Sequence, residues 1–212
     1  MSGFLVQRSF QAPGTSLCGL TWDGSYLWHS DGTTDLIYRL DPLTGETLGR
    51  VDCAQVRTEL VYEGGVLWQI AGQPKRIVKI DPESGNRIDS MDLGIKVEHI
   101  CGLDVDDQRF WLSQKDTGDI EARSKYTGER EVMYNVGEPA DGIVVLNDTI
   151  WYTSYSNRVL GAFDRTTKDI VAREQIAGKP TGICWDGDLI WYCDYERNQI
   201  NAVQVTGDIE SI

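Results

Sequence analysis

The sequence places reactive residue types at one position that recurs along the chain. In order, that position is occupied by Cys18, Thr58, Cys101, Asp141 and Thr181, at spacings of 40, 43, 40 and 40 residues. Glu59 follows the second of these residues, and His99 lies two residues before the third. A carboxyl group and an imidazole are suited to proton transfer near neutral pH. The cluster therefore predicts general acid–base catalysis, with Glu59 and His99 as the pair.

Three of the recurring residues are further catalytic candidates: Asp141, Cys101 and Cys18. His99 and Cys101 are two residues apart, so their side chains share one face of an extended segment. A cysteine nucleophile activated by His99, or a divalent or soft metal held by cysteine and histidine, suits these residue types. The spacing matches no established metal motif, and small buried cysteines are the competing interpretation. No cofactor is expected, and a metal stays an open alternative.

A second group of residues is expected to bind the substrate: Arg57, Tyr155, Tyr195, Cys193 and Arg158. Arg57 either clamps a carboxylate or neutralises the neighbouring Glu59. Asp141 has a competing structural role, because a carboxylate at a strand start can accept hydrogen bonds from backbone amides. The chain shows no phosphate loop, nicotinamide fingerprint or nucleophile-elbow serine.

The segments that carry these residues are copies of one unit. CGLTWDGSYLWHSD starts at Cys18, CGLDVDDQRFWLSQ at Cys101, DGIVVLNDTIWYTS at Asp141 and TGICWDGDLIWYCD at Thr181, and TELVYEGGVLWQIA from Thr58 is a looser copy. Five of the seven tryptophans occupy one position of the unit: Trp28, Trp68, Trp111, Trp151 and Trp191. A period near 40 residues is typical of repeat architectures, β-propellers among them.

Each unit reads as four short strands. Alternating apolar residues are separated by turns rich in Gly, Asp, Asn and Pro, such as Asp23-Gly24. No segment shows a helical stripe of ten or more residues. The pattern predicts an all-β fold, a five-bladed β-propeller with four antiparallel strands per blade. The fifth copy lacks its fourth strand, and the run from Phe4 to Phe10 is expected to supply it. Residues 1–212 would then form a single domain.

Strand alternation sorts the loops of such a fold onto two faces. One face carries repetitive turns. The other carries the blade entries and the loops after each second strand, which hold the candidate residues and also Lys75, Lys115 and Lys179. Variable loops on a repeated scaffold are common places for function. Because five blades leave a narrow channel, a small molecule is the expected partner at this central mouth.

Charge and cysteine content restrict the partners and the compartment. The formal net charge of −13 disfavours nucleic acid and anionic membrane surfaces as partners. No apolar stretch is long enough for a transmembrane helix, and the start of the chain lacks the form of a secretory signal. Five cysteines without a framework spacing favour a reducing, cytoplasmic location, with a processed secreted form as the alternative. We expect a monomer or a simple homo-oligomer.

The blade pattern, GL-x-W-D-G-x-x-L-W followed by I-x-x-I-D-P-x-x-G, resembles a superfamily of propellers. It includes streptogramin lyases, glutamine cyclotransferases of the plant and bacterial type, and lactonases related to gluconolactonase. The cyclotransferases are the most similar, since they also have five blades. Their pattern has Glu before a Gly-Leu pair, whereas here Glu59 stands directly before Leu60. Streptogramin lyases have seven blades and match in architecture only.

Two classes of function follow from these observations. The first is a small-molecule-processing enzyme that works by acid–base chemistry at the central mouth without a redox cofactor, as a lyase, a cyclotransferase or a lactone-type hydrolase. The second is a non-catalytic propeller that binds a small ligand or a protein partner on its variable face. The mutual position of Glu59 and His99 discriminates between them.

Overall fold

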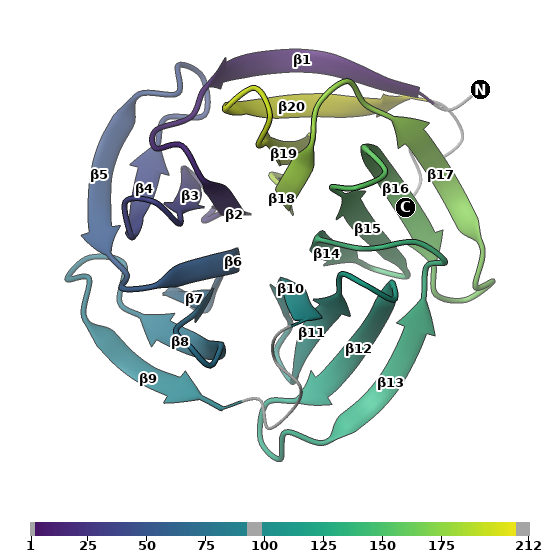
Figure 1. Ribbon diagram of the computed structural model, residues 1–212, viewed down its shortest axis with the longest axis horizontal. Coiled ribbons are helices and arrows are strands. Elements are labelled where there is room, and N and C mark those ends of the chain that lie inside the picture. The colour runs from purple at the N-terminus through teal and green to yellow at the C-terminus, as the bar shows by residue number, and fades with distance from the viewer. Residues whose placement is uncertain (1–2, 93–98, 207–212) are drawn as a thin grey trace.

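The computed structural model describes residues 3–92 and 99–206. These residues form 20 strands in five four-stranded antiparallel sheets, which are arranged as blades around a central axis (Figure 1). The innermost strands are β2, β6, β10, β14 and β18. The prediction of a five-bladed propeller is confirmed. No helix among the described residues has the length and apolar character needed to span a bilayer.

The blades follow one another in chain order. Blade 1 consists of β2 (Leu17–Trp22), β3 (Leu27–Asp31), β4 (Leu36–Leu40) and β5 (Thr47–Asp52). Blade 2 consists of β6 (Val56–Glu63), β7 (Val66–Ala71), β8 (Arg76–Ile80) and β9 (Arg87–Met91). Blade 3 consists of β10 (Ile100–Val105), β11 (Arg109–Gln114), β12 (Asp119–Ser124) and β13 (Arg130–Asn135). Blade 4 consists of β14 (Gly142–Leu146), β15 (Thr149–Ser154), β16 (Val159–Asp164) and β17 (Ile170–Gln175). Blade 5 consists of β18 (Pro180–Trp185), β19 (Ile190–Asp194), β20 (Gln199–Thr206) and β1 (Gly3–Gln11).

The ring is closed by β1, which pairs antiparallel with β20 as the outermost strand of blade 5. The register runs from Gly3 opposite Thr206 to Gln11 opposite Gln199. The ring of Phe4 packs edge-on to Trp151 of blade 4, with ring centroids 5.9 Å apart. The expectation that the N-terminal run completes the last blade is therefore confirmed.

Deletion of residues 1–11 is expected to cause aggregation and a lower melting temperature. It would leave the outer edge of β20 unpaired, and such an edge is a template for pairing with another chain. Size-exclusion chromatography and thermal melting measure the effect. Leu5→Thr is the matched control, because the Leu5 side chain is exposed and the strand stays paired. A truncated protein that is monomeric with an unchanged melting temperature would contradict the prediction.

The aspartate of the W-D-G turn explains the spacing between that turn and the anchoring tryptophan. Asp23 Oδ1 accepts hydrogen bonds from the amides of Ser25 and Tyr26, and its Oδ2 accepts one from Trp28 Nε1 at 2.7 Å. The same indole bond joins Asp106 to Trp111 and Asp186 to Trp191. One carboxylate thus caps the turn and orients the tryptophan five residues later.

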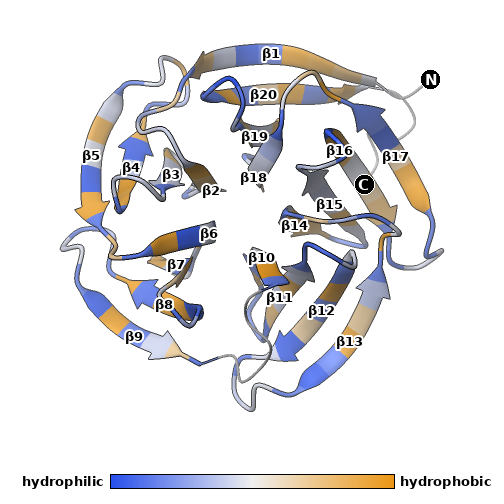
Figure 2. Ribbon diagram, in the orientation of Figure 1, coloured by the Kyte–Doolittle hydropathy of each residue, from blue (hydrophilic) through white to orange (hydrophobic). Residues whose placement is uncertain are grey.

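The apolar core consists of five clusters, and each cluster joins two neighbouring blades. Four of the anchoring tryptophans are at most 4% exposed, namely Trp28, Trp111, Trp151 and Trp191. Trp68 is less buried and packs edge-on against Phe110 of blade 3, at 5.2 Å. Apolar and polar residues alternate along the outer strands (Figure 2), as expected for strands with one face on a core. The anchors therefore hold the ring together.

Candidate functional site

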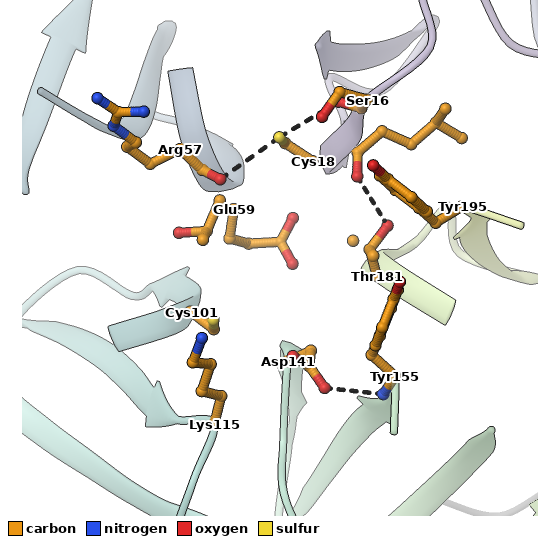
Figure 3. Close-up of a pocket in the computed structure, with 13 residues that line it drawn as sticks. Ser16, Cys18, Arg57, Glu59, Cys101, Lys115, Asp141, Tyr155, Thr181 and Tyr195 are labelled. Atoms are coloured by element: carbon orange, nitrogen blue, oxygen red, sulfur yellow. Dashed lines mark hydrogen bonds between the residues drawn. The ribbon is translucent and has the colours of Figure 1, made fainter. Parts of the chain in front are cut away.

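A cavity of about 290 Å³ lies at the central mouth (Figure 3). Its lining comes from the blade entries and from the loops after the second strands of blades 3, 4 and 5. The lining residues are Ser16, Leu17, Cys18, Arg57, Thr58, Glu59, Cys101, Lys115, Asp141, Tyr155, Thr181, Gly182 and Tyr195. Seven of the ten site residues expected from the sequence are among them. His99, Cys193 and Arg158 are not.

The blade entries leave no room for side chains at the glycine position. A Cβ on Gly142 would lie 2.5 Å from the carbonyl oxygen of Thr181, and one on Gly182 would lie 2.6 Å from that of Cys18. In blades 1, 3 and 4 the glycine amide donates to a hydroxyl two residues after the tryptophan, as in the 2.8 Å bond from Gly102 N to Ser113 Oγ. Crowding of the inner strands therefore explains both the glycine at the blade entry and the small residue two positions after the tryptophan.

Glu59 occupies the glycine position in blade 2. In that blade Ile70 replaces the hydroxyl residue, and the amide of Gln69 bonds the carbonyl oxygens of Thr58 and Glu59 instead. The Glu59 side chain extends into the space at the axis (Figure 3). Its Oε1 accepts hydrogen bonds from Leu20 N at 2.9 Å and from Leu60 N at 3.2 Å. A carboxyl that is 2% exposed therefore forms part of the cavity wall.

Burial raises the pKa of Glu59 well above its usual value. The amides of Leu20, Leu60 and Ile183 oppose the shift without cancelling it. The shift favours the protonated form of Glu59. In that form Oε1 can be the carbonyl oxygen that accepts the bonds from Leu20 and Leu60, and the other oxygen carries the proton. Glu59 can therefore act as a general acid.

Asp104 is a second carboxyl whose pKa is raised by burial, to about 7, although the amides of Val145 and Val105 oppose the shift. Its Oδ2 accepts a hydrogen bond from Val145 N of blade 4 at 2.6 Å. Thr21 makes the equivalent contact in blade 1, where its hydroxyl accepts a bond from Tyr62 N at 2.9 Å. Position and partner match, so Thr is a natural replacement for Asp104.

Stability is expected to fall as the pH rises from about 4 to about 7. The folded-state pKa of Asp104 lies above the unfolded value, so its contribution is complete below the unfolded pKa and is lost as the pH rises through about 7. Glu59 changes stability in the same direction. Thermal melts across this range should show a smaller decrease for Asp104→Thr than for the wild type. Equal slopes for both proteins would contradict the assignment.

Asp141 bridges the entry of blade 4 and the loop after β15. Its Oδ2 accepts a hydrogen bond from Tyr155 N at 2.7 Å, and its own amide donates to the carbonyl oxygen of Thr153 at 2.8 Å. Burial raises the pKa of this carboxyl, while the Tyr155 amide and the charge of Lys115 oppose the rise. Asp141 therefore fulfils its structural role and also faces the cavity.

The two cysteines of the mouth are protonated thiols at neutral pH. Burial raises the pKa of Cys18 to about 12 and that of Cys101 to about 11. The Cys18 thiol donates toward the carbonyl oxygens of Ser16 and Arg57, at 3.3 and 3.4 Å. A thiol with a raised pKa is a poor nucleophile, which argues against the cysteine mechanism. In residues 3–92 and 99–206, no group of three or more His, Cys, Asp or Glu side chains is arranged to hold a metal ion.

The structure does not place His99 against Glu59. The half-exposed imidazole of His99 is bonded through Nδ1 to Asp116, in the loop after β11, and it does not line the cavity. A carboxylate from a neighbouring loop thus directs the ring away from the position expected from the sequence. The acid–base pair of Glu59 and His99 is therefore not formed.

Cys193 and Arg158 also lie outside the cavity. Cys193 is fully buried and occupies the position at which Ser113 carries its bonding hydroxyl, so crowding at the axis explains its size. The guanidinium of Arg158 is held by both carboxylate oxygens of Glu196, at 2.6 and 2.8 Å. Neither side chain lines the cavity, and the substrate-binding roles expected for these two residues stay predictions.

Arg57 lines the cavity, but its guanidinium points away from Glu59 (Figure 3). It donates to the carbonyl oxygen of Gly72 at 3.2 Å and to Gln73 Oε1 at 3.3 Å. Arg57 therefore does not neutralise Glu59.

Lys115 is the charged lining residue that was not among the expected site residues. It lies four residues after Trp111, and Tyr155 and Tyr195 lie four residues after their own tryptophans. These three residues share one blade position, which explains why Lys115, placed on the variable face from the sequence, lines the cavity together with the two tyrosines. The rings of Tyr155 and Tyr195 meet edge-on, with centroids 5.8 Å apart.

Comparison with known proteins supports the architecture more than any one activity. No family model matches the chain. A virginiamycin B lyase from Nocardia farcinica (strain IFM 10152) is 31% identical over 77 residues, and the match covers 36% of this chain and 28% of that protein. The chain thus spans less than a third of the curated relative that it matches.

Two solved enzyme structures have the same fold over nearly their whole length. Myxococcus xanthus glutaminyl cyclase has a TM-score of 0.78 and 12% identity, covering 95% of this chain and 96% of that one. The PQQ-bound aldose sugar dehydrogenase of Streptomyces coelicolor has a TM-score of 0.65 and 14% identity, with coverages of 97% and 99%. At these identities the likeness shows the fold alone. The resemblance to cyclotransferase and streptogramin lyase propellers is confirmed at that level.

Proposed function

We propose that this propeller is an enzyme that processes a small molecule at its central mouth, with Glu59 as the general acid. The observation that carries the proposal is the side chain of Glu59 itself. It occupies the position that is glycine in every other blade, and its buried carboxyl, whose pKa is raised by burial, borders a cavity. A raised carboxyl pKa at a concave site is typical of acid–base catalysts.

In the proposed mechanism, Glu59 gives its proton to an oxygen or nitrogen of the substrate as a bond to that atom breaks. The carboxylate that forms stays within reach of the amides of Leu20 and Leu60. These donors stabilise the negative charge, and they need no rearrangement because they are already in place. The carboxylate then recovers a proton from the product side or from water. This cycle suits a lyase, a cyclotransferase or a lactone-type hydrolase.

A non-catalytic binding protein is the second candidate. Two observations favour it. The carboxyl of Glu59 already links backbone amides of the neighbouring inner strands β2 and β6, and His99 is bonded to Asp116 outside the cavity lining and does not pair with Glu59. In that case the side chain would serve chiefly to tie inner strands together. The cavity above it would bind a ligand without changing it.

Turnover assays separate the two candidates. The panel contains an N-terminal glutaminyl dipeptide and a streptogramin B, which the names of the similar proteins suggest, together with small γ- and δ-lactones. Mass spectrometry detects cyclisation, ring opening or hydrolysis. We expect turnover of at least one compound, with a rate that falls as the pH rises through the pKa of Glu59, since the protonated acid is the active form. Binding of panel compounds without turnover would favour the second candidate.

A further inference from the structure

The mouth carries positive charge on a strongly acidic protein. The formal net charge of the chain is −13, yet Lys115 lines the cavity, and Arg57 lines it with its guanidinium turned toward Gly72 and Gln73. Lys75 adds a third cation nearby, since its charge and that of Lys115 both lower the pKa of Cys101. The two lining carboxyls are Glu59 and Asp141, and burial raises the pKa of both, which favours their uncharged forms. A cavity with low-dielectric walls and this charge pattern concentrates small anions.

Lys115 has the geometry of an anion anchor. It projects from the loop after β11 with its amine directed toward Cys101 at the cavity wall (Figure 3). Within the described part of the chain, its ammonium group makes no hydrogen bond and no ion pair. The neighbouring acid, Asp116, is instead bonded to His99. The three N–H donors of Lys115 are therefore available to a ligand.

The opposite wall is aromatic. Tyr155 and Tyr195 lie across the cavity from Lys115 and meet edge-on at 5.8 Å (Figure 3). Lys179 sits over the ring of Tyr155 at 5.0 Å and helps to fix its orientation. Such a pair offers an apolar face that suits a flat ring. Glu59 lies between the two walls (Figure 3).

We propose, resting on the function assigned above, that the substrate is a small organic carboxylate that also bears a flat or aromatic ring. Its carboxylate binds Lys115, its ring packs on Tyr155 and Tyr195, and the bond that reacts lies over Glu59. The volume of about 290 Å³ is at the small end of ligand sites, which limits the substrate to a compact molecule.

Three probes of similar size test the charge preference: phenylacetate, phenylacetamide and 2-phenylethylamine. Isothermal titration calorimetry at low salt should show that phenylacetate binds at least about tenfold more tightly than the other two. Lys115→Met should remove that preference and leave the affinity for phenylacetamide unchanged. Lys168→Met is the matched control, because Lys168 is an exposed lysine in a turn between β16 and β17, away from the cavity lining.

The inference would be overturned by any of four results. These are equal binding of the three probes, tighter binding of the amine, no effect of Lys115→Met on binding, and no binding of any probe at about 1 mM. Glu59→Gln separates it from the proposed function. Phenylacetate should still bind this variant, since binding does not require the acid. If turnover survives in Glu59→Gln while the carboxylate preference is intact, the acid role is wrong and the anion site stands. If only uncharged substrates are turned over, in a manner that needs Glu59, the anion site is wrong and the acid role stands.

Discussion

Glu59→Gln should lower turnover at least about a hundredfold while leaving the fold intact, because positioned proton transfer is worth roughly 10²–10⁴ in rate. Gln keeps a carbonyl oxygen that can accept the hydrogen bonds from the amides of Leu20 and Leu60. It also keeps nearly the same volume at the axis. What it loses is a proton that can be transferred at neutral pH. Steady-state kinetics and a thermal melt of the same preparation measure both effects.

His99→Ala is the control for this experiment. His99 was an equal candidate from the sequence, but its imidazole is bonded to Asp116 outside the cavity lining. Its removal should change turnover by less than about threefold, which is within the range of an indirect effect. A variant pair in which Glu59→Gln is active and His99→Ala is inactive would reverse the assignment of the acid.

Trp151→Ala should destabilise the protein by about 3–5 kcal/mol, the cost of a large cavity in a packed core. Trp151 is 4% exposed, packs with Ile183 of blade 5 and meets the ring of Phe4 on β1. Its loss therefore weakens the interface of blades 4 and 5 and the closing strand together. Chemical denaturation with tryptophan fluorescence gives the free energy of unfolding.

Trp185→Ala is the matched control for the anchor. Trp185 is outside the repeated position and 41% exposed, so its replacement should cost less than about 1 kcal/mol. Similar losses for both variants would mean that the repeated position has no special role in packing. A loss below about 1 kcal/mol for Trp151→Ala would contradict the core assignment directly.

The fold was predictable from the sequence because each blade needs the same residue types at the same positions. The turn aspartate and the anchoring tryptophan are five residues apart in blades 1, 3 and 5, since one carboxylate bonds both the turn and the indole. Crowding at the axis imposes glycine on the inner strands. Glu59 was identifiable as the exception to that rule, and the structure places it in the lining of the cavity.

The parts of the site that were not predictable depend on contacts that no repeat imposes. His99 takes its direction from Asp116, and Arg158 is engaged by Glu196, an acid from the loop of another blade. Both acids lie five residues after the anchoring tryptophan of their blade, but the residues that they bond occupy different blade positions, so the repeat does not show which partner each acid takes. The place of Cys193 outside the cavity lining has a different cause. Its equivalence to the hydroxyl of Ser113 marks it as a structural residue, but that equivalence has meaning only once the bond to the glycine amide is known.

The pairing of the first strand with the last also means that β1 is synthesised long before its partner strand. Among the described strands, β1 leaves the ribosome first, yet its partner β20 is the last to be translated, since Gly3 pairs with Thr206. At about 5–20 residues per second, β1 waits roughly 10–40 seconds without its hydrogen-bonding partner. During that interval its unpaired backbone is open to chaperones and to the β20 strand of a neighbouring chain. Exchange of β1 between two chains would close both rings equally well, so dilute expression and fast chaperone capture favour correct closure within one molecule.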